Sequence, residues 1–161
     1  MEERYIWRDY DPQAMDFVDA WLGAESIRST GLEDGFQDFY AYWAHEDGFI
    51  LGKNYWCKVI YIGDTPFAVM ALCLHEGKLS IMEMLVAPEF RGRGRGTKLL
   101  RQLLGSDKVL GFPIPKCEAV IFPNNVASQR AFEKAGFSCF HVHAAGTALY
   151  YAYDSGANDE S

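Results

Sequence analysis

Arginine and glycine alternate over six positions just past the middle of the chain. The six residues are Arg91, Gly92, Arg93, Gly94, Arg95 and Gly96. Glycines let backbone N–H groups surround the oxygens of an anion, because they carry no Cβ. Arginine side chains add charge-assisted hydrogen bonds to phosphate. This spacing therefore favours a site for a phosphate-bearing ligand.

The common nucleotide-binding loops and RNA-binding tracts do not match the spacing of this turn. A P-loop needs a GK[ST] triplet, whereas Gly96 is followed by Thr97 and Lys98. A dinucleotide fingerprint needs GxGxxG, and here the glycines alternate. RNA-binding Arg-Gly tracts are long repeats, whereas this one is short and bracketed by apolar segments. A solvated basic loop remains the alternative that involves no ligand.

The elements around the turn are the ones that anion binding needs. An apolar strand is predicted over residues 79–86, and Pro88 ends it. A helix with four leucines is predicted over residues 97–104. The first turn of a helix presents unpaired N–H groups and the positive end of its dipole. The sequence therefore places the turn where a strand passes into a helix.

The remaining patterns predict a mixed α/β protein. Helices are expected from Asp11-Pro12 onward, over residues 34–45 with an aromatic stripe, and over residues 125–135 ending at Gly136. Strands are expected over residues 4–8, 55–62, 66–75, 119–122, 139–143 and 147–153, in addition to 79–86.

The composition of the chain limits the number of domains, the partners and the location that can be expected. A chain of 161 residues that is 49% apolar and 23% charged suits one domain, expected over residues 1–153, with a disordered acidic tail over 154–161. A net charge of −7 argues against nucleic acid and anionic membranes as partners. No apolar run reaches the roughly 20 residues that span a bilayer. The acidic N-terminus lacks the pattern of a secretory signal, so a cytoplasmic location is expected.

No metal site is expected. The four cysteines, Cys57, Cys73, Cys117 and Cys139, lack CxxC spacing, so each is predicted to be a buried reduced thiol. His141 and His143 share one strand without further ligands that the sequence identifies.

Two segments resemble the GNAT (Gcn5-related N-acetyltransferase) family. The first is Arg91-Gly92-Arg93-Gly94-Arg95-Gly96, which is similar to the pattern [QR]-x-x-G-x-[GA] between strand and helix. The second runs from Asn125 to Phe137 and resembles N-x-x-[AS]-x-x-x-[YF]-E-K-x-G-F. The resemblance implies a mixed, mostly antiparallel sheet flanked by helices and splayed between the fourth and fifth strands.

The resemblance also implies acetyl-CoA as co-substrate and a set of residues around it. By this resemblance the coenzyme is held by Leu85, Val86, Arg91, Gly92, Arg93, Gly94, Arg95, Gly96, Thr97, Asn125, Ser128 and Phe132. Backbone N–H groups near Leu85 or Val86 would polarise the thioester carbonyl. For Asn125, a role as helix cap fits the sequence equally well.

Glu83 is the candidate catalytic base, because it is a carboxylate inside the apolar run from Ile81 to Leu85. Burying a charge without a partner is unfavourable. A cleft-facing base explains the residue, and so does a carboxylate paired or exposed on the sheet. Some family members carry their carboxylate three positions earlier, where this chain has Ser80.

Phe132 stands where many members of the family have a tyrosine, and it cannot donate a proton. Ser128, a tyrosine among Tyr150, Tyr151 and Tyr153, or water would have to replace that acid.

The expected function is transfer of an acetyl group from acetyl-CoA to a primary amine of a small molecule or peptide, by direct attack in a ternary complex. N-terminal aromatic residues (Trp21, Phe36, Phe39, Tyr40, Trp43, Tyr55, Trp56) and acids (Glu25, Glu33, Asp34, Asp38, Glu46, Asp47) suit a cationic amine, although most of these aromatics are expected in the core. A non-catalytic acyl-CoA sensor is the alternative, and a nucleic-acid-binding regulator ranks third. The sequence does not decide whether the chain forms a homodimer.

Overall fold

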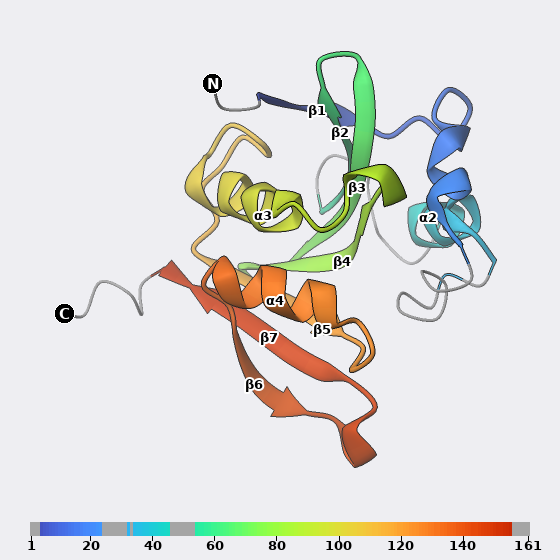
Figure 1. The fold of residues 1–161 in the computed structure, drawn as a ribbon. Coiled ribbons are helices and arrows are strands. Elements are labelled where there is room, and N and C mark those ends of the chain that lie inside the picture. The colour runs from blue at the N-terminus through green and yellow to red at the C-terminus, as the bar shows by residue number, and fades with distance from the viewer. Residues whose placement is uncertain (1–3, 24–31, 33, 46–53, 156–161) are drawn as a thin grey trace. The chain divides into compact units, whose positions relative to one another are not determined.

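The computed structural model describes residues 4–23, 32, 34–45 and 54–155. The chain divides into two compact units, Met1–Cys73 with Met82–Phe90, and Leu74–Ile81 with Arg91–Ser161. Seven strands form one sheet in the order β1-β2-β3-β4-β5-β7-β6 (Figure 1). The sheet is mostly antiparallel with a parallel β4–β5 pair, which confirms the mixed α/β fold class.

The elements agree with the predicted order from the second helix onward. The first half contains β1 (Tyr5–Asp9), η1 (Asp16–Trp21), α2 (Phe36–His45), β2 (Tyr55–Ile62), β3 (Thr65–His75), β4 (Lys78–Val86) and η2 (Pro88–Phe90). The second half contains α3 (Arg95–Gly105), β5 (Lys116–Ile121), α4 (Val126–Lys134), β6 (Ser138–Val142), η3 (Ala144–Gly146) and β7 (Leu149–Asp154).

In the first unit, β1, β2 and β3 form an antiparallel meander. Tyr5 pairs with Ile62, and Tyr55 pairs with Cys73. The run Phe67 to Leu72 is buried on both faces of the sheet. This burial follows from the sequence, because an uninterrupted apolar run is typical of a strand that is covered on both sides.

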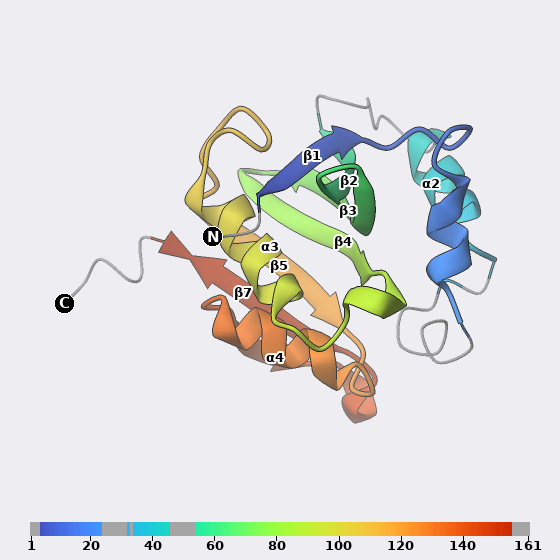
Figure 2. The ribbon, with the colours of Figure 1, turned by 45° about the horizontal axis from the view of Figure 1, so that its top comes forward.

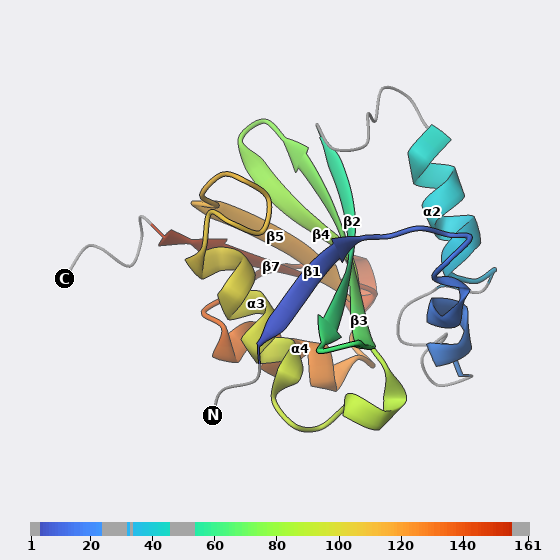
Figure 3. The same cartoon turned by 90° about the horizontal axis from the view of Figure 1, so that it is seen from above.

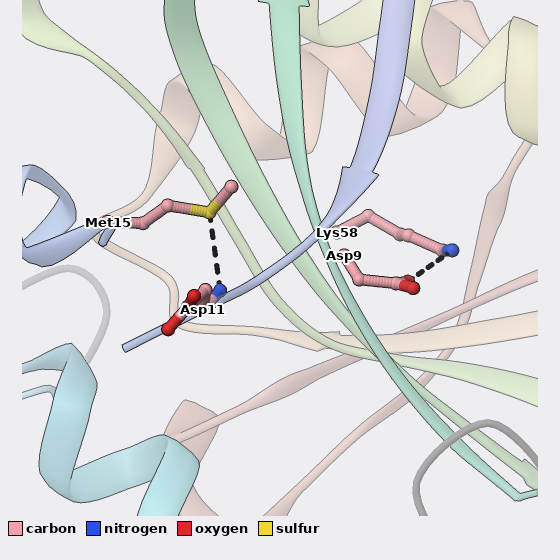
Figure 4. Close-up of polar contacts among 4 residues, drawn as sticks. All are labelled: Asp9, Asp11, Met15 and Lys58. Atoms are coloured by element: carbon pink, nitrogen blue, oxygen red, sulfur yellow. Dashed lines mark hydrogen bonds and ion pairs between the residues drawn. The ribbon is translucent and has the colours of Figure 1, made fainter. Parts of the chain in front are cut away.

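The prediction of a helix from Asp11-Pro12 onward is wrong. The chain forms turns there and then the short 3-10 helix η1. Asp11 Oδ1 accepts hydrogen bonds from the N–H groups of Gln13 and Ala14. The Asp11 N–H donates to the Met15 sulfur at 3.3 Å, as Figure 4 shows beside the Asp9–Lys58 ion pair. Local side-chain bonds of this kind compete with helix formation.

The start of α2 is held by η1. Asp19 Oδ1 accepts a hydrogen bond from the Phe36 N–H at 2.6 Å, and Figure 3 shows the two helices side by side. The predicted aromatic stripe of α2 then packs inward: Phe36 is fully buried and meets the Tyr10 ring edge-on at 5.1 Å.

Most of the predicted N-terminal aromatics are core residues, as expected. Phe36 and Tyr55 are fully buried, and Trp56 is 9% exposed. Phe39, Tyr40 and Trp43 are partly buried against the same core. The expected acids Glu25, Glu33, Glu46 and Asp47 lie outside the described residues.

In the second unit, the first part of β4 lies beside β5. The parallel register covers Leu79 to Ile81 of β4 against Cys117 to Ala119 of β5. The splay expected farther along these strands stays a prediction. β7 lies between β5 and β6 and is antiparallel to both. Asp154 is the last residue of β7, and the Ser155 N–H donates to Pro115 O, so the strand extends past the expected tail boundary. Residues 156–161 lie outside the described part of the chain.

The helices α3 and α4 pack together in this unit (Figure 2). Leu99, Leu100 and Leu103 of α3 are fully buried, as the leucine pattern predicted. Arg101 Nη2 donates to the Lys134 carbonyl oxygen at 2.9 Å, which satisfies a carbonyl at the end of α4.

The four cysteines are free. Cys57 and Cys117 are buried, as predicted, whereas Cys73 is partly exposed and Cys139 is exposed. The prediction of burial is therefore wrong for Cys139, because β6 lies at the end of the sheet. Within the described residues, no His, Cys, Asp and Glu side chains gather into a group that could hold a metal ion. None of the described helices has the length and hydropathy of a membrane span.

Candidate functional site

The glycine-rich turn is open and exposed. It follows η2, which comes directly after β4. In η2 the Phe90 N–H donates a hydrogen bond to Ala87 O at 2.9 Å. Gly92 and Gly94 have φ values of 78° and 74°, a left-handed conformation that favours glycine. A Cβ added to either glycine would have no neighbouring atom within 4 Å. The turn therefore leaves its backbone accessible to a ligand.

The helix α3 begins within this turn, at Arg95 rather than at the predicted Thr97. Arg95 and Gly96 thus belong to its first turn, where backbone N–H groups have no helical acceptor. Gly94 is the N-cap, and no side chain caps the helix. The Lys98 N–H donates to Gly94 O at 3.1 Å as the first intrahelical bond. An exposed N-terminus of this kind fits an anionic group such as a diphosphate.

The helix α4 begins differently, because a side chain caps it. Asn125 Oδ1 accepts a hydrogen bond from the Ser128 N–H at 3.2 Å. The structure thus provides the capping role, one of the two roles predicted for Asn125. The nearby Gln129 holds the preceding turn through Nε2, which donates to Pro123 O at 2.9 Å and to Phe122 O at 3.4 Å. Sequence reasoning did not find this contact.

Phe132 lies in the core of the second unit. It is 2% exposed, and its ring centroid lies 4.9 Å from that of Phe137 and 6.5 Å from that of Tyr151. A side chain this buried presents almost no surface to a coenzyme. Packing therefore explains Phe132 better than the predicted coenzyme contact does.

Tyr151 is engaged in the same core. Its hydroxyl donates to Glu133 Oε1 at 3.1 Å, and only 2% of the residue is exposed. Burial raises the pKa of Tyr151 to about 12, and the adjacent Glu133 carboxylate acts in the same direction. A phenol held in this way is a poor proton donor at neutral pH. The other hydroxyls predicted to replace the missing acid, those of Ser128, Tyr150 and Tyr153, belong to partly exposed residues.

On β4, Glu83 lies among apolar neighbours, as predicted, and is only partly exposed. Burial raises the pKa of its carboxyl to about 8, and a hydrogen bond from the Met84 N–H opposes part of that effect. Met82 and Leu85, on either side of Glu83 in the chain, both pack against the core of the first unit.

Leu85 and Val86 end the strand in the first unit. The Leu85 side chain is 4% exposed and belongs to the core, so the side chain itself is not available to a ligand. Directly after Val86, the Ala87 N–H donates to Phe67 O at 2.7 Å, which ties the end of β4 to β3.

These features define a class of protein: a mixed-sheet α/β fold with an exposed glycine-rich turn between a strand and a helix that no side chain caps. The sequence matches the acetyltransferase (GNAT) family over residues 16–137, which is most of the chain. The protein belongs to this family, and the resemblance of its two motifs is confirmed.

Solved structures share the fold. The chain is similar to the aminoglycoside acetyltransferase AAC(6')-Ib in complex with coenzyme A, with a TM-score of 0.73, 18% identity and coverage of 98% of this chain and 100% of that chain. A spermidine N-acetyltransferase from Vibrio cholerae in complex with CoA and spermine gives a TM-score of 0.70 at 14% identity, covering 96% of this chain and 98% of that one. No curated protein sequence matches the chain.

Proposed function

We propose that the protein transfers an acetyl group from acetyl-CoA to a primary amine by direct attack in a ternary complex. The observation that carries this proposal is the uncapped start of α3 behind Gly92 and Gly94, in a chain of the acetyltransferase family. The pyrophosphate of the coenzyme suits this site, because it can accept hydrogen bonds from backbone N–H groups of the first helical turn. Arg91 and Arg93 are exposed and supply positive charge.

In this reaction the amine nitrogen forms a bond to the thioester carbonyl carbon, and the carbon–sulfur bond breaks. Glu83 accepts the proton that the amine loses, directly or through water. Its raised pKa near 8 supports this role, because a base works best when its pKa lies near the working pH. Backbone N–H groups near Leu85 or Val86 polarise the carbonyl oxygen.

The departing thiolate takes its proton from water or from Ser128. Phe132 has no acidic proton, and the Tyr151 hydroxyl is committed to Glu133. A thiol has an ordinary pKa of about 8.5, so a thiolate leaves without full proton transfer near neutral pH. The cytoplasmic location expected from the sequence stays a prediction.

The acceptor that we propose is a small cationic amine. The first unit contains fifteen Asp and Glu against five Lys and Arg, a balance of −10, whereas the second contains seven against ten, a balance of +3. An anionic coenzyme suits the positive unit, and a cationic acceptor suits the negative one. The solved relatives that were crystallised with kanamycin or spermine also support a cationic amine as the acceptor.

The test uses a glycine substitution in the turn. Gly94→Asp should abolish binding of acetyl-CoA, because a carboxylate would enter the space for the phosphates and repel them. Gly77→Asp is the matched control, since Gly77 also has a positive φ, 79°, and open surroundings. Binding is measured by thermal-shift titration and calorimetry. Equal affinity in the two variants would refute the proposed site.

Activity is then measured as release of free thiol with a panel of amines. Turnover with cationic amines and not with neutral nucleophiles is the expected result. Tight binding of acetyl-CoA without turnover of any amine would favour the alternative, a non-catalytic acyl-CoA sensor.

A further inference from the structure

Glu118 is a carboxylate in the middle of β5. Among the described residues of the second unit it is the only Asp or Glu inside a strand, since Asp154 ends β7 and the others lie in connecting segments or in α4. Lys78 Nζ donates to Glu118 Oε1 at 3.1 Å, and the two side chains are 46% and 35% exposed. Glu is depleted in strands, and a surface ion pair adds only about 0–1 kcal/mol of stability. Stability therefore does not account for this carboxylate.

The Glu118 side chain lies on the face of the sheet that points away from α4. Strand residues alternate between the two faces. Tyr151 bonds to Glu133 of α4, and its partner in the register is Ala119 of β5, so both belong to the α4 face. Glu118 and Val120 therefore point to the opposite face. Val120 is 53% exposed, which shows that this face is open at β5.

The neighbours of Glu118 on this face leave its carboxylate accessible and provide apolar surface beside it. In the register, Ser80 of β4 lies on one side of Glu118 and Ala152 of β7 on the other, and both side chains are small. Two residues farther along β5, Val120 pairs with Tyr150. Diagonal neighbours of this kind are about 7–8 Å apart. A small ligand bound at Glu118 can therefore also contact Val120 and Tyr150.

The Tyr150 ring lies in a cluster of uncharged rings on this face. Its centroid is 5.4 Å from that of His141 and 6.2 Å from that of Phe140. Residues 137–153, which include β6 and most of β7, contain no Asp, Glu, Lys or Arg. This hairpin thus adds no Lys or Arg that would compete for Glu118, and Lys78 is the cation that it contacts.

A carboxylate beside aromatic and aliphatic side chains suits an alkylammonium group, which carries a charge on an apolar chain. In acetyl transfer the attacking amine must be neutral. A second amine of the same molecule, with an ordinary pKa of about 10.4, keeps its proton at neutral pH. An acceptor with two amines therefore has one group for the reaction and one for a carboxylate.

We propose that Glu118 binds the second ammonium group of a diamine acceptor, with the methylene chain of the acceptor over Val120 and Tyr150. This inference rests on the proposed acetyl transfer. The second unit has a charge balance of +3, so a cation that binds there needs a specific carboxylate. The ammonium group replaces Lys78 at Glu118. One cation is exchanged for another, and the partly exposed Lys78 returns to water.

Steady-state kinetics with the diamine putrescine and the monoamine butylamine tests the proposal at saturating acetyl-CoA. Glu118→Gln should raise KM for putrescine about tenfold, because a charge-assisted hydrogen bond to the second ammonium group is lost. The kcat for putrescine and the KM for butylamine should stay within about twofold. Asp107→Asn is the matched control, since it removes an exposed carboxylate of the same unit and should change neither KM.

The partner of Glu118 gives a second variant with the opposite expectation. Lys78→Met removes the competing cation and should lower KM for putrescine about threefold. Lys108→Met is its control, because Lys108 is an exposed lysine of the same unit. A purely structural ion pair would shift KM in the same direction in Glu118→Gln and Lys78→Met. Circular dichroism and the unfolding midpoint confirm that each variant is folded.

Calorimetric titration of putrescine in the presence of coenzyme A measures binding without turnover. Its Kd should rise about tenfold in Glu118→Gln. Equal KM and Kd in the parent and Glu118→Gln would overturn the inference, and so would shifts in the same direction in Glu118→Gln and Lys78→Met. In either case turnover of amines by the parent leaves the proposed function standing. Absence of turnover with every amine would instead refute the proposed function, and the calorimetric Kd then decides whether Glu118 binds the diamine.

Discussion

At the residue scale, burial of the Glu83 carboxyl among apolar neighbours raises its pKa to about 8. The ionised form is the one that can accept a proton, and its fraction rises with pH. We expect kcat/KM to increase about tenfold per pH unit below 8 and to level off above it. Glu83→Gln should remove this limb and lower kcat/KM by about two to four orders of magnitude. The measurement is a pH–rate profile at saturating acetyl-CoA.

The acceptor for this profile needs a reacting amine that titrates well below pH 7 and a second, permanently cationic group, so that it stays a cation throughout. With such an acceptor, the deprotonation of the substrate cannot produce the limb near pH 8. A limb of the same position and height in Glu83→Gln would show that another group is the base.

The same raised pKa has a consequence for stability that does not depend on activity. The ordinary pKa of an exposed Glu is about 4.3, so the folded protein holds this proton over a range in which the unfolded chain has lost it. Stability therefore falls as pH rises from about 4.5 to about 8. Glu83→Gln should be more stable than the parent at pH 9, by a few kcal/mol, and the difference should shrink at pH 5. Urea unfolding at the two pH values measures it, and a pH-independent difference would argue against a buried carboxyl.

At the scale of secondary structure, the two helices of the second unit begin in opposite ways. Helix α4 is capped by the Asn125 side chain, whereas α3 has no side-chain cap. Asn125→Ala should therefore lower the free energy of unfolding by about 1 kcal/mol and leave the affinity for acetyl-CoA within about twofold. Asn125→Ser keeps an acceptor for the Ser128 N–H and should restore most of the stability. A loss of affinity in both variants, without a loss of stability, would instead assign Asn125 to the coenzyme.

The sequence predicted most elements because each carried its own local signal. The leucines of α3 and the apolar run of β3 specify their burial without reference to the rest of the fold. The segment after Asp11 was misread because Asp-Pro is typical of a helix start, whereas the bonds from Gln13 and Ala14 to Asp11 form a local turn. No sequence pattern reports which of these two local arrangements is preferred.

Only part of the candidate site could be predicted from the sequence. The turn from Arg91 to Gly96 could be recognised because glycine spacing records a backbone conformation, and the positive φ values of Gly92 and Gly94 agree with it. The burial of Phe132 beside Phe137 and Tyr151 could not be recognised from the sequence. It depends on packing against β7, which is distant in the sequence. The same holds for the bond between Tyr151 and Glu133.

At the scale of the whole molecule, charge is divided between the two units, with balances of −10 and +3. The first strand pair already places Asp9 beside Lys58 at 2.6 Å, so one of the few cations of the acidic unit is neutralised locally. The remaining acids of that unit give a field that attracts cations over roughly a Debye length, which salt shortens. The net charge of −7 alone conceals this division.

This division predicts a salt dependence that distinguishes acceptors by their charge. Raising NaCl from about 50 to about 500 mM shortens the Debye length about threefold, so kcat/KM for a polycation such as spermine should fall by about tenfold. A monocationic amine of similar pKa should change by less than about twofold, because each charge contributes separately to the attraction. Acetyl-CoA is kept saturating throughout, so that the response of the coenzyme to salt does not enter. If both amines respond equally, the acidic unit does not attract the acceptor, and the preference for cationic substrates would have to arise from contacts at short range, where salt has little effect.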